Sequence, residues 1–145
     1  MSKSDVFEAG IQALIFNNTP FTLLGDAAGL LGSAAAGSLF LSLHTADPGE
    51  AGTQLTSETA YTGYARVAVA RTVGGFTITG SSVSPTANVN FPVCTAGTST
   101  VTHLGIGTSS TGAGKLLYKG ALNSSIAVAS GVTPGISTAT TIVED

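Results

Sequence analysis

The chain has 145 residues and a formal net charge of −3, and only 9% of its residues are charged while 43% are hydrophobic. This length allows one domain with a hydrophobic core and leaves no room for two domains of ordinary size. Its five cations are too few and too scattered to form the basic stripe of a nucleic-acid-binding protein, so we expect no DNA or RNA partner; they are Lys3, Arg66, Arg71, Lys115 and Lys119.

The charged fraction lies far below the roughly 25% that is usual in soluble domains, and two interpretations of the surface stay open. One is a β surface rich in Ser and Thr, which is polar without being charged. The other is a surface largely buried against neighbouring subunits, because charged residues are depleted at the cores of interfaces. Both interpretations can apply to the same chain.

Residues 1–20 predict an N-terminal arm that contains the chain's one convincing helix. Ser2 or Ser4 can cap this helix, and acidic residues in its first turn favour the helix dipole. The run Asn17-Asn18-Thr19-Pro20 ends it. Its apolar face packs either on its own domain, which we favour because such stripes are most often core, or on a neighbouring subunit. This face consists of Phe7, Ile11, Leu14 and Ile15.

The sequence predicts neither a secretory signal nor a membrane span. Lys3 is followed closely by Asp5 and Glu8, and no small-residue cleavage site follows an apolar core. Residues 27–43 are uncharged, but glycines interrupt them and they fall short of the roughly 18–20 strongly apolar residues that a span needs. We therefore expect synthesis in a cytoplasm, no membrane partner, and a small-residue loop that leads into a buried strand.

From residue 38 onward, short strand patterns alternate with clusters of Gly, Pro, Ser and Thr. No run between them has helical periodicity, so parallel βαβ units are not expected. The sequence predicts a mainly β fold, an antiparallel β-sandwich of jelly-roll type that spans residues 21–145 as a single domain. The expected strands are 38–44, 64–72, 76–79, 87–91, 100–106, 115–119, 125–129 and 139–143.

The long loop between the first two strands begins with the turn residues Asp47-Pro48-Gly49. A loop of this length in a compact domain needs packed side chains of its own or a partner. Tyr61 and Tyr64 at its end are expected to anchor it, and a place in a binding surface is the alternative. Its carboxylates are expected to be solvated, with a cation site as the alternative; they belong to Asp47, Glu50 and Glu58.

Four isolated polar side chains have structural interpretations. Arg66 lies on the exposed face of its strand, and we expect it to pair with a carboxylate of this chain or of a neighbour. Cys94 follows an apolar run, and as the single cysteine it is expected to be a buried structural thiol. His44 and His103 occupy strand positions where a ring nitrogen can bond a nearby backbone or hydroxyl group.

No motif predicts catalysis, a cofactor or a metal. Gly112-Ala113-Gly114-Lys115 resembles the end of a phosphate loop, but Ser109 and Leu116 stand where such a loop needs Gly and Ser or Thr. Gly105-Ile106-Gly107 lacks the third glycine of a dinucleotide fingerprint. No Ser lies in a Gly-x-Ser-x-Gly elbow, and the two histidines have no metal-ligand spacing. We expect a protein that is not an enzyme.

Four segments together resemble a family of small virion proteins of tailed bacteriophages, variously described as tail-fibre-like or capsid-associated. They are the LHTADPG turn at 43–49, the TGYARVAV strand at 62–69, the VTHLGIG run at 101–107 and the TGAGKLLYKGAL segment at 111–122. The similarity extends from the first strand to the C-terminal TIVED. It implies a structural protein of the virion, made in the cytoplasm of the host bacterium, that contacts other virion proteins and itself.

Three functions remain from different classes. The first, which the sequence favours, is capsid decoration, cementing or a head-to-tail collar, in which repeated interfaces stabilise the particle. The second is a tail fibre or receptor-binding tail tip. The third and most remote is a soluble ligand-binding or hydrolytic sandwich, which would need a convergent polar pocket. For either virion function we expect a homo-oligomer.

Inter-subunit contacts are expected in the parts of the chain that a sandwich core explains least: the helix, the long loop and the C-terminal segment. The candidate residues are Phe7, Ile11, Leu14, Ile15, Asp47, Glu50, Glu58, Tyr61, Tyr64, Arg66, Ile142 and Val143.

Overall fold

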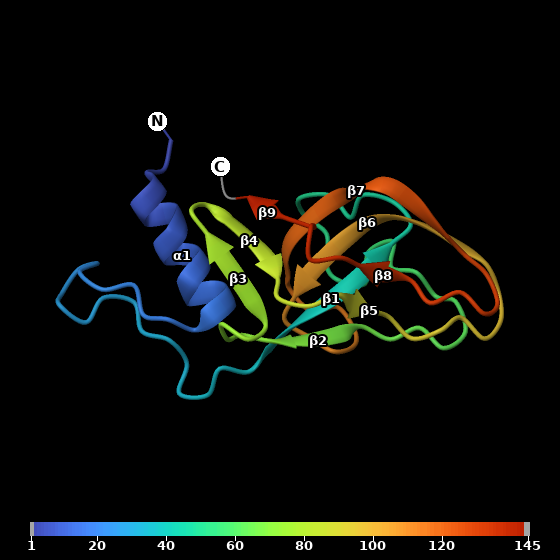
Figure 1. Ribbon diagram of the computed structural model, residues 1–145, viewed down its shortest axis with the longest axis horizontal. Coiled ribbons are helices and arrows are strands. Elements are labelled where there is room, and N and C mark those ends of the chain that lie inside the picture. The colour runs from blue at the N-terminus through green and yellow to red at the C-terminus, as the bar shows by residue number, and fades with distance from the viewer. Residues whose placement is uncertain (1, 144–145) are drawn as a thin grey trace. The chain divides into compact units, whose positions relative to one another are not determined.

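The structure, a computed structural model, describes residues 2–143. These residues form two compact units, which Figure 1 shows with their elements labelled. The helical unit comprises residues 2–38, 69–88 and 137–143, and the sheet unit comprises residues 39–68 and 89–136. The expected division into an arm over 1–20 and one domain over 21–145 stays a prediction.

The scaffold of the sheet unit is a four-stranded sheet in the order β2-β1-β6-β7. The central strands β1 (Ser38–His44) and β6 (Ser99–Gly107) are antiparallel, with Leu41 opposite Ile106 and His44 opposite His103. β2 (Val67–Ala70), whose last two residues belong to the helical unit, and β7 (Leu116–Val128) flank them. The alternation of apolar side chains along β1 therefore places Leu41 in the core, as the sequence predicts.

Both faces of β1 are buried, in agreement with the buried strand that the sequence predicts after the small-residue loop. Ser42 and His44 lie on the polar face and are as inaccessible as the leucines. The reason is that the long loop after β1 folds back over this strand: Thr59 N–H donates to Leu43 O at 2.9 Å, and Thr45 N–H donates to Ser57 O at 2.8 Å. The loop is thus part of the buried structure of the sheet unit.

Strand β7 is one element where the sequence predicts two, over 115–119 and 125–129. Its pairing with β6 shifts register in the middle, because Val101 is opposite Ile126 while His103 is opposite Ala121. Residues 122–125 therefore face a single residue of β6 and form a bulge, which bends the strand without ending it. The sequence reasoning located the two paired halves and missed their continuity.

A second, two-stranded sheet completes the sheet unit. β5 (Val89–Asn90) and β8 (Gly135–Ile136) are antiparallel, with Val89 opposite Ile136. Both of these apolar side chains are buried, together with Phe91. β8 was not expected from the sequence, because Pro134 and Gly135 are residues typical of turns.

The helical unit packs α1 (Asp5–Asn17) on β3 (Phe76–Thr79) and β4 (Ser82–Pro85), which belong to a sheet in the order β3-β4-β9 (Figure 1). The rings of Phe16 and Phe76 meet edge to face, with centroids 5.0 Å apart. β4 was missed because Ser and Pro frame it; β9 (Ile142–Val143) falls within the expected 139–143 strand.

The helix packs on its own unit, the alternative that the sequence favours, but with a different face from the one predicted. The residues buried in the structure are Glu8, Gln12 and Phe16, while Phe7, Ile11, Leu14 and Ile15 are half-buried. Gln12 Nε2 donates to Ser81 O at 2.6 Å. The physical reason is that β3 and β4 cover one side of α1 and Phe21 covers another. The position of a single apolar stripe therefore does not predict which residues are buried.

Arg71 binds the C-terminal turn of α1 to the chain that follows it. Its Nε donates to Ile15 O at 2.6 Å and its Nη2 to Leu14 O at 2.7 Å, while Nη1 donates to Ala36 O at 3.1 Å. The last carbonyls of a helix have no partner within the helix. Arg71 supplies that partner, and Asn18, in the left-handed conformation with φ 54°, ends the helix where the sequence predicts.

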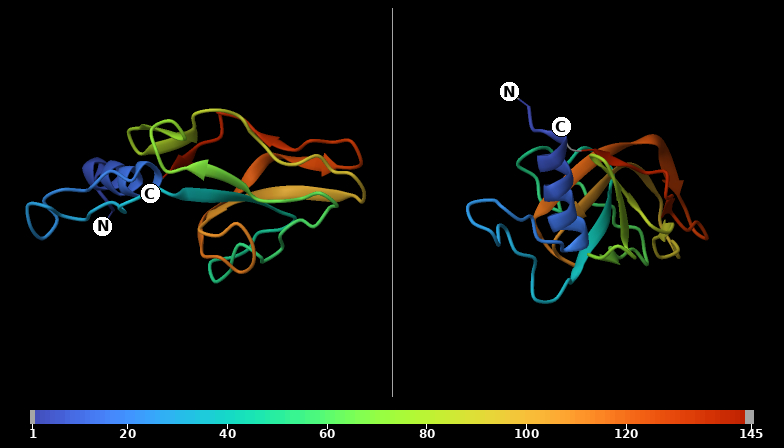
Figure 2. Two further views of the ribbon diagram at one scale, coloured as in Figure 1. Left: turned by 90° about the horizontal axis from the view of Figure 1, so that it is seen from below. Right: turned by 60° about the vertical axis from the view of Figure 1, so that its left-hand side comes forward.

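Residues 19–37 form a loop whose second half contains the small-residue run that the sequence predicts from residue 27 onward, and they run beside α1 in each view of Figures 1 and 2. Phe21 lies against the helix: its ring centroid is 5.7 Å from that of Phe7, and a Cβ at Gly10 would stand 2.9 Å from the Phe21 ring. Gly10 is therefore a packing position, because the ring occupies the space that a larger side chain would need.

The fold class predicted from the sequence is confirmed at the coarser level: the chain is mainly β with one N-terminal helix, and its sheets are antiparallel. In the part of the chain that is described, the strands do not close into a barrel. Two expected strands, 38–44 and 76–79, have the same bounds in the structure. The jelly-roll arrangement stays a prediction.

Candidate functional site

The most buried charged group of the sheet unit is an ion pair between Arg66 and Glu58, whose side chains are 2% and 9% exposed. The contact is bidentate: Arg66 Nε and Nη2 donate to the two carboxylate oxygens of Glu58, each at 2.7 Å. The expected carboxylate partner is confirmed, and it comes from the same chain. The expected exposure of Arg66 was wrong, because the folded-back loop covers the end of its strand.

The remaining donors of Arg66 reach a second loop. Nη1 donates to Ser109 O at 2.9 Å and Nη2 donates to Gly112 O at 2.7 Å. Hydrogen bonding to the Glu58 carboxylate raises the pKa of Arg66 above its ordinary value. A single guanidinium thereby joins the 45–62 loop to the 108–114 loop.

Tyr64 and Tyr61 anchor the end of the long loop, as the sequence predicts. The Tyr64 hydroxyl donates to Glu58 Oε1 at 2.8 Å and accepts the N–H of Leu43 at 3.0 Å. Burial raises the pKa of Tyr64, and the neighbouring Glu58 carboxylate adds to the rise. The Tyr61 hydroxyl donates to Pro92 O at 2.8 Å. Tyr64 therefore holds the loop to β1, and Tyr61 holds it to the segment that follows β5.

His44, the last residue of β1, lies on the polar face of this strand and is fully buried. Its Nδ1 is 2.8 Å from Thr56 O, and its Nε2 is 2.9 Å from Ser42 Oγ. This confirms the expected backbone and hydroxyl partners. Burial lowers the pKa of His44 below its ordinary value. The uncharged ring therefore suits this site, where Nδ1–H donates to the carbonyl and Nε2 accepts from the Ser42 hydroxyl.

Glycines of β6 make room for these polar side chains. A Cβ at Gly105 would stand 2.5 Å from His44 Nε2 and 2.7 Å from Ser42 Oγ. A Cβ at Gly107 would overlap the side chain of Gln54. Gln54 in turn donates from Nε2 to Phe40 O at 3.1 Å and accepts the N–H of Ser109 at 2.9 Å. Packing against these buried polar side chains therefore explains the two glycines of the VTHLGIG run.

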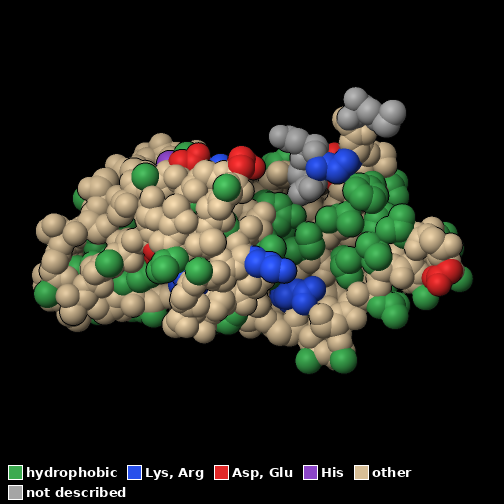
Figure 3. Space-filling view, turned by 180° about the vertical axis from the view of Figure 1, so that it is seen from behind, with side chains coloured by type: hydrophobic (Ala, Val, Ile, Leu, Met, Phe, Trp, Pro, Cys, Tyr) green, Lys and Arg blue, Asp and Glu red, His purple; other side chains and the backbone are tan. Residues whose placement is uncertain are grey.

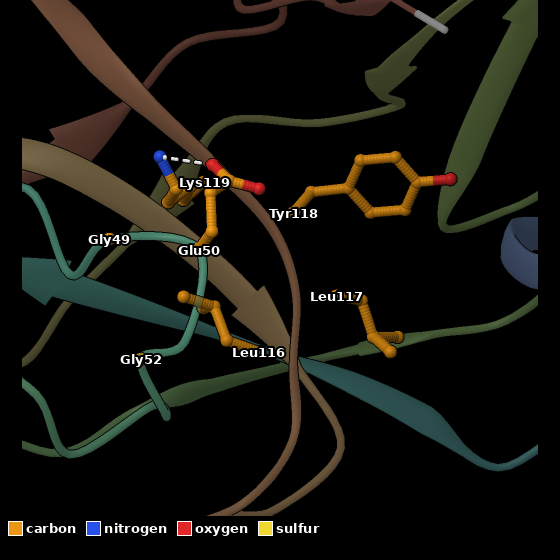
Figure 4. Close-up of a pocket in the computed structure, with 7 residues that line it drawn as sticks. All are labelled: Gly49, Glu50, Gly52, Leu116, Leu117, Tyr118 and Lys119. Atoms are coloured by element: carbon orange, nitrogen blue, oxygen red, sulfur yellow. Dashed lines mark ion pairs between the residues drawn. The ribbon is translucent and has the colours of Figure 1, made fainter.

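A groove of about 330 Å³ lies between the start of the long loop and β7 (Figure 4). Lys119 Nζ is 3.0 Å from Glu50 Oε1 and 3.1 Å from Asp47 Oδ1. In Figure 4, Lys119 and Glu50 face each other, while the side chains of Leu117 and Tyr118 lie apart from this pair. The groove is lined by Gly49, Glu50, Gly52, Leu116, Leu117, Tyr118 and Lys119.

The charged groups of the groove form ion pairs with each other. Hydrogen bonds from the Gly49 N–H and then from Lys119 lower the pKa of Asp47. Hydrogen bonds to Glu50 and Asp47 raise the pKa of Lys119. Glu58 is held elsewhere by Arg66, so the three loop carboxylates do not form the single cluster that the cation-site alternative requires. Within residues 2–143, no three His, Cys, Asp or Glu side chains are grouped as a metal site.

The helical unit presents many apolar side chains on the face drawn in Figure 3. Figure 3 shows hydrophobic side chains gathered over α1 and the loop beside it. The loop exposes four leucines at Leu23, Leu24, Leu30 and Leu31; Leu23 is 80% and Leu31 is 69% exposed. Large exposed patches of this type mark interaction sites. The C-terminal candidates Ile142 and Val143 pair with β4, and Val143 remains exposed.

The structure brings together part of the predicted residue set: Glu58, Tyr61, Tyr64 and Arg66 form one network, and Asp47 and Glu50 meet Lys119. Their role in contacts with a partner stays a prediction. Sequence reasoning missed Gln54 and the leucines of residues 21–31. The sequence feature that indicates exposed leucines here is that residues 21–31 contain a single charged residue. In the described chain, no helix is long and apolar enough to cross a membrane.

Replacing Arg66 tests how much the ion pair contributes to the free energy of unfolding. Arg66→Met leaves a buried carboxylate without its cation, so we expect the free energy of unfolding to fall by about 3–5 kcal/mol. Urea denaturation at neutral pH measures this change.

The double variant Arg66→Met/Glu58→Gln should lose less than the two single variants combined, because it leaves no uncompensated charge. Lys115→Met, at an exposed cation, is the matched control and should stay within about 0.5 kcal/mol of the unmodified protein. A similarly small loss for Arg66→Met would show that the pair does not stabilise the fold.

The depressed pKa of His44 predicts a loss of stability in mild acid. A histidine whose pKa is lowered by folding binds protons more readily when unfolded, so stability falls as pH drops below the unfolded value of about 6.5. We expect the unfolding free energy to decrease from about pH 7.5 to about pH 5, and His44→Gln to show a smaller decrease. Equal pH dependence in both proteins would contradict a neutral, buried His44.

The comparisons with known proteins agree with a virion protein. A protein-family model described as "Podophage GP4 fiber I protein gp80" matches residues 4–144. No curated protein matches the chain significantly. The family match covers nearly the whole chain and confirms both the resemblance to phage virion proteins and the expectation of a structural, non-enzymatic role. The chain therefore belongs to the gp80 family of podophage fiber proteins and is a fiber component of the phage virion.

Proposed function

We propose that the chain is a subunit of a podophage tail fibre and acts through protein–protein contacts, both with other copies of itself and with further virion proteins. The observation that carries this proposal is the match to a fiber family over residues 4–144. This family favours the tail fibre, which the sequence left as an alternative, over capsid decoration or a collar. The two sheets of the sheet unit also support, without establishing, the jelly-roll sandwich.

Two features of the structure support an adhesive role. The loops of the sheet unit are held by Arg66, Tyr64 and Gln54, so the unit enters an assembly with little conformational freedom left to lose. The helical unit offers apolar side chains to solvent, which bury favourably on contact. Of the predicted interface residues, those of α1 and β9 suit this role best, because they keep exposed or half-exposed apolar surface.

A receptor-binding tip has less support. Tyr61 and Tyr64 contact their own chain, and the sequence contains no tryptophan, so the aromatic platform on which a sugar would stack is not evident. We therefore place the function of the chain in assembly and attachment within the fibre.

Quantitative mass spectrometry of purified virions, with the major capsid and tail proteins as internal standards, tests the proposal. We expect a small, fixed number of copies per particle, and antibodies against the chain should label the tail by electron microscopy. Abundance near that of the capsid protein would instead indicate decoration of the head. Absence from purified particles would contradict any structural role in the virion.

A further inference from the structure

We propose that residues 116–119 of β7, the β7 edge, bind an extended, basic segment of another virion protein as an added β-strand. The inference rests on the proposed fibre function and adds the surface, the conformation of the partner and its charge. Its starting point is the place of β7 at one end of the order β2-β1-β6-β7. Among the described residues, β6 is the only strand that pairs with β7.

The 45–62 loop begins a further strand beside β7 and then diverges from it. Thr53 forms an antiparallel bridge with Lys115, and the N–H of Gln54 donates to Gly114 O at 3.0 Å. If the loop continued this ladder, residues 49–52 would lie opposite residues 116–119. Instead, residues of these two segments line the groove of about 330 Å³ in Figure 4. The groove therefore lies where the ladder would continue.

An extended backbone suits this position. The edge of a sheet presents a row of N–H and C=O groups that can pair with another chain, and such pairing binds extended peptides. β7 has 13 residues, whereas β2 at the opposite edge has 4, so β7 offers the longer ladder. A Cβ at Gly49 or at Gly120 would meet no atom within 4 Å. Both the loop and the strand thus leave room for an approaching backbone.

The charge of the groove favours a basic segment. Asp47 and Glu50 share the single ammonium group of Lys119, so the groove holds an excess of negative charge. The side chain of Glu50 is 95% exposed and that of Asp47 is 54% exposed, and both carboxylates can accept further hydrogen bonds. A Lys or Arg of the added strand would compensate the excess. The same excess disfavours an acidic segment, an anionic lipid surface and a nucleic acid.

A second copy of the chain fits the β7 edge less well than a different protein. Its own β7 carries Lys115 and Lys119, but its 45–62 loop brings Asp47 and Glu50 to the same place. Two identical edges would therefore bring both pairs of carboxylates together, and like charges at a contact repel each other. A basic segment without such a loop avoids this repulsion.

Titration of the intact, isotope-labelled chain with a short peptide of alternating valine and lysine tests the proposal by NMR. We expect saturable shifts of the amide resonances of residues 116–119, with a dissociation constant on the order of 0.1–1 mM. A peptide of alternating valine and glutamate should bind at least about tenfold more weakly, because its charge adds to that of the groove. A valine–lysine peptide with every second amide N-methylated keeps its charge but loses the donors for strand pairing, and it should not bind.

Two charge-reversal variants separate the groove from the overall charge of the chain. Glu50→Lys should weaken binding of the valine–lysine peptide at least about tenfold, because it reverses the excess charge of the groove. Asp5→Lys makes the same change in net charge at an exposed residue of the helical unit. At physiological salt, where distant charges are screened, it should leave the dissociation constant within about twofold. Circular dichroism verifies that each variant is folded.

Three results of the titration would overturn the proposal. They are the lack of saturable shifts at residues 116–119, equal binding of the N-methylated peptide, and equal weakening by Glu50→Lys and Asp5→Lys. Shifts centred on β2 instead of β7 would also overturn it, because they would assign strand addition to the other edge.

Cross-linking in assembled particles separates this inference from the proposed function. A photoreactive phenylalanine derivative in place of Leu117, which is 40% exposed on β7, should cross-link to a segment of another virion protein that contains Lys or Arg. Glu50→Lys should abolish this cross-link. Cross-links only between copies of this chain would overturn the proposed partner while the fibre function stands. Absence of the unmodified chain from virions would contradict the fibre function itself, and the peptide titration would still decide whether the β7 edge accepts a strand.

Discussion

The buried pair of Arg66 and Glu58 fixes the loops of the sheet unit. A guanidinium withdrawn from water needs acceptors in fixed positions, and these come from the Glu58 carboxylate and from two carbonyls of the 108–114 loop. Displacing the 45–62 loop would leave a buried charge unpaired, at a cost of several kcal/mol. Displacing the 108–114 loop would remove two carbonyl acceptors from Arg66. The loops are therefore as constrained as the strands, which explains how an extended connection covers the polar face of β1.

In the helical unit, too, a single arginine binds carbonyl groups of separate segments. Arg71 joins the carbonyls of the last turn of α1 to that of Ala36, as Arg66 joins two loops. Arg66, Arg71 and Lys119 all bind partners within their own chain. Much of the small number of charges thus serves internal contacts, and little remains to solvate the outer surface. An adhesive fibre protein can use such a surface, because uncharged faces are inexpensive to dehydrate on assembly.

The sequence predicted those parts of the fold that local chemistry determines. The alternation in 38–44 and the helix that ends at Asn18 follow from side-chain period and turn residues, and both are present in the structure. What the sequence could not supply depends on distant partners. Burial of Arg66 requires a loop that begins more than fifteen residues earlier, and the two halves of β7 become one strand only because β6 pairs with both. The face that α1 buries was missed for the same reason, since the helix is covered from several sides. The network around Glu58 was found in part, through Tyr61, Tyr64 and Arg66, but Gln54 carried no indication in its local sequence.

Hydrogen–deuterium exchange of the intact chain tests most directly whether the 45–62 loop is an ordered part of the sheet unit. The amides of Thr45, Gln54 and Thr59 donate to backbone carbonyls in the structure. The account predicts that they exchange at least about a hundredfold more slowly than in an unstructured peptide, as the amides of β1 and β6 do. Exchange of these three amides at the rate of a free peptide, while β1 and β6 remain protected, would contradict a loop fixed by the buried ion pair.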